Sequence, residues 1–125
     1  MRPSLTVAAL FMAILPGPAG AQVSPFNANT IVPGCRAMLV AAGQPNLQMT
    51  AETAVLVGMC IGIVAETMWS GDFLKESMRS CAPVDSNVAQ AIRIILKYLE
   101  SQPEFLLQDF RMLTVSALHQ AWPCR

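Results

Sequence analysis

The sequence predicts an all-α fold, a small disulfide-stapled bundle of about four main helices. Three observations support this prediction: the apolar run Ala54–Ala65, apolar residues spaced three or four apart in later segments, and four cysteines. The run Ala54–Ala65 has no charged residue and is bounded by Glu52 and Glu66. It is too short to cross a hydrocarbon core, which needs about 20 apolar residues. We therefore predict a buried helix in the middle of the domain.

The N-terminus has the three parts of a secretory signal peptide. Arg2 precedes the apolar run Leu5–Leu15, and the run is followed by Pro16–Pro18 and by the small-residue cleavage site Ala19–Ala21. We predict that residues 1–21 are removed on export and that the mature form has no membrane segment. A membrane anchor is the alternative interpretation.

The mature chain is close to neutral. Removing Arg2 from the eight basic residues leaves seven, against eight acidic residues, and no segment concentrates the basic ones. Proteins bind phosphate backbones through clusters of Lys and Arg, so a nucleic-acid partner is not expected. The 125 residues less the predicted leader of 21 leave 104, enough for one domain with one core.

The mature chain is expected to begin with a segment that is not helical. Residues 22–33 contain Ser, Asn, Thr and Pro without apolar periodicity, which predicts an extended lead-in before a helical domain at residues 34–125. The first helix is expected to run from about Thr30 or Gly34 to Ala42, where a glycine and a proline follow.

The central helix is expected to begin after Thr50, a good N-cap residue, and to end near Trp69–Gly71. Gly58 and Gly62 lie one turn apart on one side of this helix, and Cys60 points to the other side. The glycine pair predicts close approach of a second helix, and Cys60 predicts a covalent link to another.

Two more helices are predicted in the second half of the chain. Asp72–Pro83 is expected to be a loop or a short irregular helix. Asp85 or Ser86 then caps a helix that ends near Glu100. The fourth helix is expected to open at Gln102–Glu104, with proline in its first turn and a capping box. The predicted buried faces are Val88, Ala91, Ile92, Ile95, Leu96 and Leu99 in the third helix, and Leu106, Phe110, Leu113, Ala117 and Ala121 in the fourth.

An even number of cysteines in an exported chain predicts two disulfides. Cys35 and Cys60 lie nearly equally far from the turn between the first two helices. Cys81 and Cys124 lie nearly equally far from the turn at Gln102. Antiparallel helix pairs therefore favour Cys35–Cys60 with Cys81–Cys124, and the other two connectivities stay open.

No catalytic apparatus is expected. The cysteines are too widely spaced for a redox pair, and His119 is the one histidine available for a Cys/His metal site. Asp85 and Ser86 are interpreted as capping residues, and no Ser/His/Asp set or carboxylate pair stands out. We predict no catalytic, cofactor-binding or metal-binding residues.

Four short stretches resemble the Rap/Tai family of immunity proteins, which protect bacteria against the peptidoglycan-cleaving amidase effectors of type VI secretion systems. They are Cys60–Ile63, Cys81–Pro83, Lys97–Glu104 and Ala117–Cys124. The stretches carry three of the four cysteines, a proline turn and a glycine expected to pack closely. The resemblance covers the chain from about Gly34 to its end.

The resemblance implies a non-enzymatic protein that docks on a secreted amidase effector in the periplasm, often as a homodimer, and blocks the catalytic cleft with a protruding segment. The best candidate for that segment is Trp69–Arg79. Aromatic and arginine side chains are common anchors of interfaces, so partner-binding roles are expected for Trp69, Phe73, Lys75 and Arg79.

Two alternatives compete with this interpretation. Trp69 and Phe73 could close the bottom of the core instead of contacting a partner. The whole protein could be a periplasmic acid-stress chaperone of the HdeA type, or another periplasmic binding module. Eight acidic residues and a high apolar content favour a rigid core over an acid-released surface.

Overall fold

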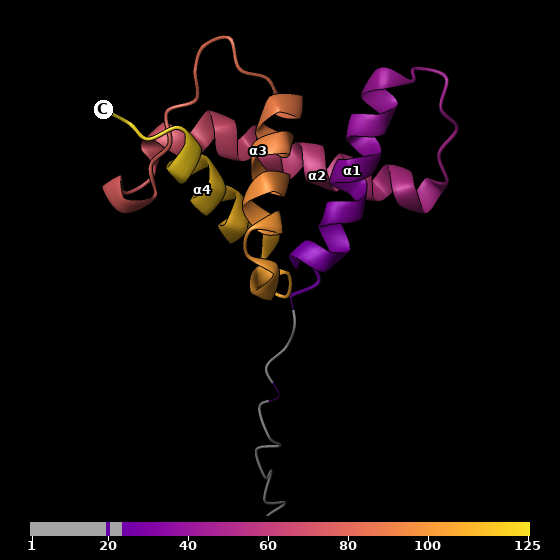
Figure 1. Cartoon of the computed structure of the whole chain (residues 1–125), viewed down its shortest axis with the longest axis horizontal. Helices are drawn as coiled ribbons and strands as arrows, with labels where there is room; N and C mark the ends of the chain where they lie inside the picture. The colour runs from indigo at the N-terminus through magenta and orange to yellow at the C-terminus, as the bar shows by residue number, and fades with distance from the viewer. Residues whose placement is uncertain (1–19, 21–23) are drawn as a thin grey trace, which may run out of the picture.

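The computed structural model describes Gly20 and residues 24–125, and the predicted signal peptide lies almost wholly outside these residues. The described chain is all helical, as predicted. Figure 1 shows α2 lying crosswise to the other three α-helices. The helices are α1 (Ala28–Gly43), α2 (Ala51–Ser70), α3 (Val88–Glu100) and α4 (Phe110–Ala121), with 3₁₀ turns η1 (Gly71–Phe73), η2 (Glu76–Met78) and η3 (Pro103–Phe105).

The first helix begins earlier than expected, so the extended lead-in predicted for residues 22–33 is wrong over its second half. Asn27 is the N-cap, and its side chain accepts a hydrogen bond from the Thr30 backbone N–H. Pro33 lies inside the helix rather than in its first turn. The early start buries Ala28 and Ile31 completely.

Among the described helices, α1 and α2 form the most extensive contact. Cys35 and Cys60 form the predicted disulfide, with 5.3 Å between their Cα atoms. One residue before Cys35, the Cα of Gly34 packs directly against the backbone of Leu56. A Cβ at position 34 would overlap the Leu56 carbonyl group, so glycine permits this approach.

The predicted packing at Gly58 and Gly62 is wrong. Both glycines are exposed, and a Cβ built on either would meet no atom within 4 Å. Cys60 and Val64, on the opposite side of α2, are fully buried. The prediction of a buried helix is therefore correct only for the side that carries Cys60, because the glycine side faces outward and the close approach occurs at Gly34.

The predicted stripe of α3 forms the middle of the core. Ala91, Ile92, Ile95, Leu96 and Leu99 are buried and Val88 is half-buried. The N-cap is Asn87, whose side chain accepts from the Gln90 N–H, rather than Asp85 or Ser86. Ser86 instead donates from its hydroxyl to the Pro83 carbonyl and closes the preceding turn.

The fourth helix begins later than predicted. Pro103 starts only the 3₁₀ turn η3, and the Ser101 hydroxyl donates to the Tyr98 carbonyl instead of forming a capping box. Asp109 caps α4 by accepting from the Arg111 N–H. Of the predicted face, Phe110, Leu113 and Ala117 are buried, Leu106 is half-buried and Ala121 is exposed; Thr114 and Leu118 are buried in addition.

The start of α4 is joined to the start of α1. The Phe110 N–H donates to the Phe26 carbonyl at 2.7 Å, and the Ser24 hydroxyl donates to the Asp109 carboxylate at 3.0 Å. The Arg111 guanidinium lies 2.8 Å from the same carboxylate and 5.1 Å from the Phe26 ring centre. The hydrogen bond from Arg111, with a smaller one from Ser24, lowers the pKa of Asp109 to about 2 against the opposing effect of its burial.

Within the described residues, Ala51–Phe73 is long and apolar enough to span a membrane by length and composition alone. One such helix is weak evidence, because the core helix of a soluble protein passes the same test. One side of α2 contributes Cys60, Val64 and Thr67 to the protein core. Its other side carries exposed Val55 and Trp69.

Candidate partner-binding site

The segment Trp69–Arg79, called the contact segment below, lies at the C-terminal end of α2. It comprises the last two residues of the helix, the turns η1 and η2, the residues between them, and Arg79 after η2. Asp72–Pro83 was predicted as a loop or short irregular helix, and the two 3₁₀ turns match that description. Figure 1 shows the segment projecting at one end of the molecule, away from the α1–α2 turn.

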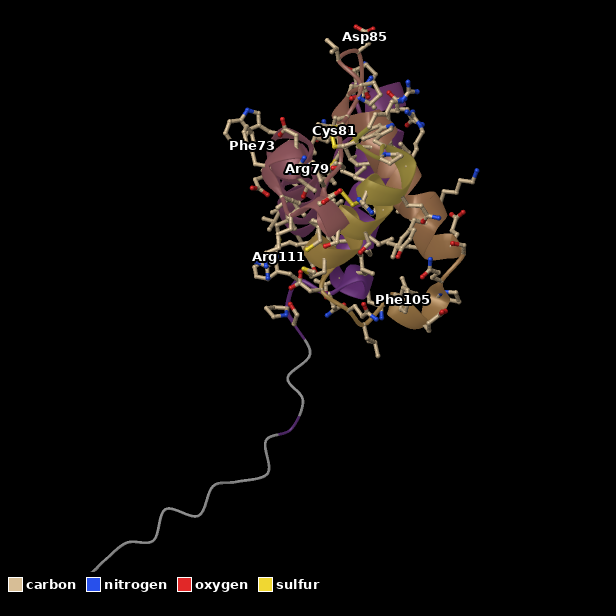
Figure 2. All side chains as sticks on the ribbon, turned by 90° about the vertical axis from the view of Figure 1, so that its left-hand side faces the viewer. Phe73, Arg79, Cys81, Asp85, Phe105 and Arg111 are labelled. Carbon is tan, nitrogen blue, oxygen red and sulfur yellow. A yellow bond between two sulfur atoms is a disulfide. The ribbon has the colours of Figure 1, made fainter. Side chains whose placement is uncertain are left out.

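The two aromatic residues of the contact segment stand in solvent. Trp69 and Phe73 are each 77% exposed. Their ring centres lie 6.0 Å apart with the planes tilted by 47°, within the range of favourable aromatic pairs. Figure 2 shows Phe73 pointing away from the body of the protein. The alternative in which these two residues close the core is therefore excluded.

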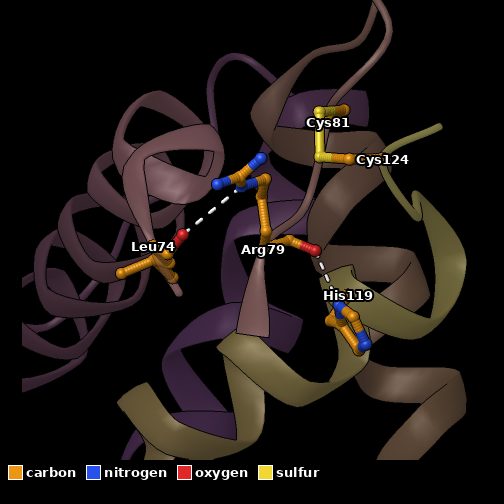
Figure 3. Close-up of a disulfide and its surroundings, with 5 residues drawn as sticks. All are labelled: Leu74, Arg79, Cys81, His119 and Cys124. Atoms are coloured by element: carbon orange, nitrogen blue, oxygen red, sulfur yellow. Dashed lines mark hydrogen bonds between the residues drawn. A yellow bond between two sulfur atoms is a disulfide. The ribbon is translucent and has the colours of Figure 1, made fainter. Parts of the chain in front are cut away.

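The charged residues of the contact segment are also exposed. Lys75 and Arg79 lie among Asp72 and Glu76, so the segment carries two charges of each sign. The Arg79 side chain donates from Nε to the Leu74 carbonyl at 3.3 Å, which folds it back along the segment (Figure 3). The contact segment therefore combines an aromatic pair with two charges of each sign, and aromatic and arginine side chains are enriched at protein–protein interfaces.

Two shallow depressions flank the Trp69 indole. One of 520 Å³ lies between the aromatic pair and the returning chain and is lined by Met68, Trp69, Asp72, Phe73, Ser80, Cys81 and Ala82. The other, of 450 Å³, lies toward the start of α3 and is lined by Ala65, Met68, Trp69, Ala82, Pro83, Ser86, Asn87 and Val88. Both depressions are therefore lined in part by Trp69, together with Met68 and Ala82.

The end of the contact segment is fastened to α4 and the C-terminus. The Ser80 N–H donates to the Gly71 carbonyl, and the Cys81 N–H donates to the Trp122 carbonyl at 2.8 Å. Cys81 and Cys124 form the second predicted disulfide, with 4.9 Å between their Cα atoms. The exposed tip is thus held from its base.

The imidazole of His119 contributes to the same fastening. Its Nδ1 lies 2.6 Å from the Arg79 carbonyl oxygen (Figure 3). Because a carbonyl only accepts, Nδ1 must carry the proton in this contact. The sequence analysis missed this role for His119, because the two residues are far apart in the chain.

The contact segment presents an aromatic pair and charged side chains of both signs. Among the described residues, no group of three or more His, Cys, Asp or Glu side chains is placed to hold a metal ion. The four predicted partner-binding residues lie on one projecting segment. A signal for the exposure of Trp69 was present in the sequence: nine residues at about 100° each place it opposite Cys60 on the helix, away from the α1 side.

The comparison with protein families gives one match. The model of the Rap1a immunity proteins matches residues 34–124. The matched range contains all four cysteines and the whole contact segment. No curated protein and no solved structure matches the chain significantly.

Proposed function

The chain belongs to the Rap1a immunity protein family, and we propose that it binds a type VI secreted peptidoglycan amidase in the periplasm and blocks its active site sterically. The family indicates an immunity protein for a secreted effector and a non-catalytic role. The amidase target, the periplasmic location and the steric mechanism are our proposal.

The exposed aromatic pair is the observation that carries the steric mechanism. Trp69 and Phe73 would lose little of their core packing on binding, since each is 77% exposed in the free chain. Each ring brings a large apolar area to an interface with few rotatable bonds. Because the base of the segment is fastened at Ser80 and Cys81, the tip is positioned before the partner arrives, which lowers the entropic cost of binding.

A homodimer, implied by the resemblance, belongs to the same proposal. The outward side of α2 supports it, because Val55 is 61% exposed and Gly58 and Gly62 have open space above them. A charge at position 55 should raise the dissociation constant of the dimer in sedimentation equilibrium. Val84→Glu is the control, because Val84 is 99% exposed on the loop before α3 and is not part of α2. Equal self-association of Val55→Glu and Val84→Glu would exclude this surface.

A pull-down tests the function directly. The mature, oxidised protein is immobilised and exposed to the secreted amidases of its own source, and any amidase retained is assayed for peptidoglycan cleavage. We expect a tight complex with blocked cleavage. Failure to retain an amidase, with both disulfides formed, would contradict the proposal and favour the chaperone or general binding interpretations.

A further inference from the structure

The two disulfides differ in how well a reductant can reach them. Cys35 and Cys60 are 1% and 0% exposed, between α1 and α2. Cys81 is exposed and Cys124 is half-buried. Thiol–disulfide exchange requires the attacking thiolate to reach a sulfur atom. A small dithiol should therefore reach Cys81–Cys124 more readily than Cys35–Cys60, which is covered.

The accessible disulfide holds the base of the contact segment. Next to it are the Cys81 N–H to Trp122 carbonyl bond and the isolated bridge between Ser80 and Pro123. The other contacts of the segment are single hydrogen bonds: the Met78 and Arg79 N–H groups donate to the Lys75 and Glu76 carbonyls, the Ser80 N–H donates to the Gly71 carbonyl, and Arg79 contacts Leu74 and His119. Six of its residues from Asp72 to Arg79 are exposed and none is buried.

The buried disulfide holds a different part of the molecule. Cys35 and Cys60 belong to the main core cluster, together with Ile31, Val64 and Ile95. Neither Cys81 nor Cys124 belongs to that cluster. Opening Cys81–Cys124 would therefore leave the helical core covered and cross-linked.

We infer that Cys81–Cys124 is a redox-controlled clasp on the binding surface: the contact segment is ordered for its partner only while this disulfide is formed. The inference rests on the proposed function, because it assigns regulation to the same site. The reductant is a dithiol, free or carried by a protein. Reduction of the chain before it meets an oxidising compartment would keep the segment loose and the partner unbound.

The exchange is a balanced two-electron reduction. One thiolate of the dithiol attacks the Cys81 sulfur, the bond to Cys124 breaks, and Cys124 leaves as a thiolate that takes up a proton. The second thiol, as its thiolate, attacks the mixed disulfide and releases Cys81, which is protonated in turn. The dithiol leaves as a disulfide, and its two protons and two electrons end on Cys81 and Cys124.

Alkylation and proteolysis test the clasp without the partner. The mature protein is titrated with dithiothreitol, alkylated with iodoacetamide and mapped by mass spectrometry, while parallel samples are cut briefly with trypsin. We expect Cys81 and Cys124 to react at least about tenfold sooner than Cys35 and Cys60. Cleavage after Lys75 and Arg79 should then become at least about tenfold faster, because trypsin cuts in proportion to the fraction of molecules in which the contact segment is open. Helical circular dichroism should not change.

Cleavage after Lys97, inside α3, serves as the internal control and should stay slow. The double variant Cys81→Ser with Cys124→Ser should show fast cleavage after Lys75 and Arg79 without dithiothreitol. If this variant does not fold, the titration of the wild-type protein decides alone. Reaction of all four cysteines together, or unchanged cleavage after reduction of Cys81–Cys124, would overturn the inference.

Binding of the amidase, measured with the oxidised and the selectively reduced protein, distinguishes this inference from the proposed function. Selective reduction should weaken binding of a retained amidase by at least about tenfold. Unchanged binding would overturn the clasp and leave the immunity function standing. No binding by the oxidised protein would overturn the immunity function, while the order of reduction and the cleavage result would still report on the disulfide.

Discussion

The Nδ1 atom of His119 lies 2.6 Å from the carbonyl oxygen of Arg79, forty residues earlier in the chain. This contact joins α4 to the end of the contact segment, next to the Cys81–Cys124 disulfide. A neutral hydrogen bond contributes about 1 kcal/mol to stability. Its effect is local, because it restrains a segment that has little core of its own.

His119→Ala is expected to loosen the base of the contact segment. The Arg79 carbonyl loses its side-chain partner, so the amides of Ser80 and Cys81 should exchange hydrogen faster, by about fivefold for a loss of about 1 kcal/mol. Hydrogen exchange measured by NMR checks this. Gln120→Ala is the matched control, since Gln120 is the exposed neighbour on α4. Equal exchange in both variants would show that the His119 contact does not restrain the segment.

Trp69→Ala and Phe73→Ala are expected to weaken binding of the amidase. An aromatic anchor at an interface contributes about 2 kcal/mol, so each variant should raise the Kd by about 30-fold in isothermal titration calorimetry. The melting temperature should barely move, because each side chain is 77% exposed. Leu107→Ala, at a residue 64% exposed outside the segment, should bind like the wild type. Wild-type affinity in both aromatic variants would place the interface elsewhere.

Gly34→Ala and Gly58→Ala should have opposite effects on stability. A methyl group at position 34 meets the Leu56 backbone, and overpacking of this kind costs about 2 kcal/mol. A methyl group at position 58 meets nothing within 4 Å and improves helix propensity by about 1 kcal/mol. Urea unfolding of dilute protein measures both. Stabilisation by Gly34→Ala would contradict the close approach of α1 and α2.

Stability should fall in acid through Asp109. Its pKa is about 2 in the folded chain, below the ordinary value of about 3.9 for the unfolded chain. The contribution is therefore complete above about pH 5 and is lost as the pH falls toward 2. It amounts to about 1 kcal/mol, discounted because the Arg111 side chain is 60% exposed.

Asp109→Asn is the variant that isolates this effect, because asparagine keeps the N-cap and removes the titration. Between pH 5 and pH 2 the unfolding free energy of the wild type should fall by about 1 kcal/mol more than that of Asp109→Asn. Chemical denaturation at each pH measures the difference. Parallel pH profiles would show that the Asp109–Arg111 pair does not stabilise the fold.

Local signals allowed parts of the fold to be predicted from the sequence. Thr50 caps α2 as expected, because capping needs only the hydroxyl and an amide three residues on. Cys35–Cys60 was predicted from the equal distance of the two cysteines from one turn, although α1 and α2 cross each other rather than run antiparallel. The start of α1 was missed because residues 22–33 lack apolar periodicity, whereas Asn27 is fixed by its bridge to Asp109, a distant partner.

The sequence analysis selected the segment Trp69–Arg79, but it did not predict the contacts that hold this segment in place. Trp69 and Phe73 were singled out by residue type, and the structure exposes both. Whether a tryptophan at a helix end is buried depends on how the remaining helices pack, which local sequence does not determine. The contact between His119 and Arg79 arises only when α4 returns to the end of α2.

Inhibition of a retained amidase at several peptidoglycan concentrations tests the central claim most directly. If the contact segment occupies the catalytic cleft, inhibition by the wild-type protein is competitive: rising substrate restores the rate and the maximal rate is unchanged. Trp69→Ala with Phe73→Ala should inhibit only at much higher concentration. A complex that forms with full affinity while the bound amidase still cleaves peptidoglycan would contradict the steric account.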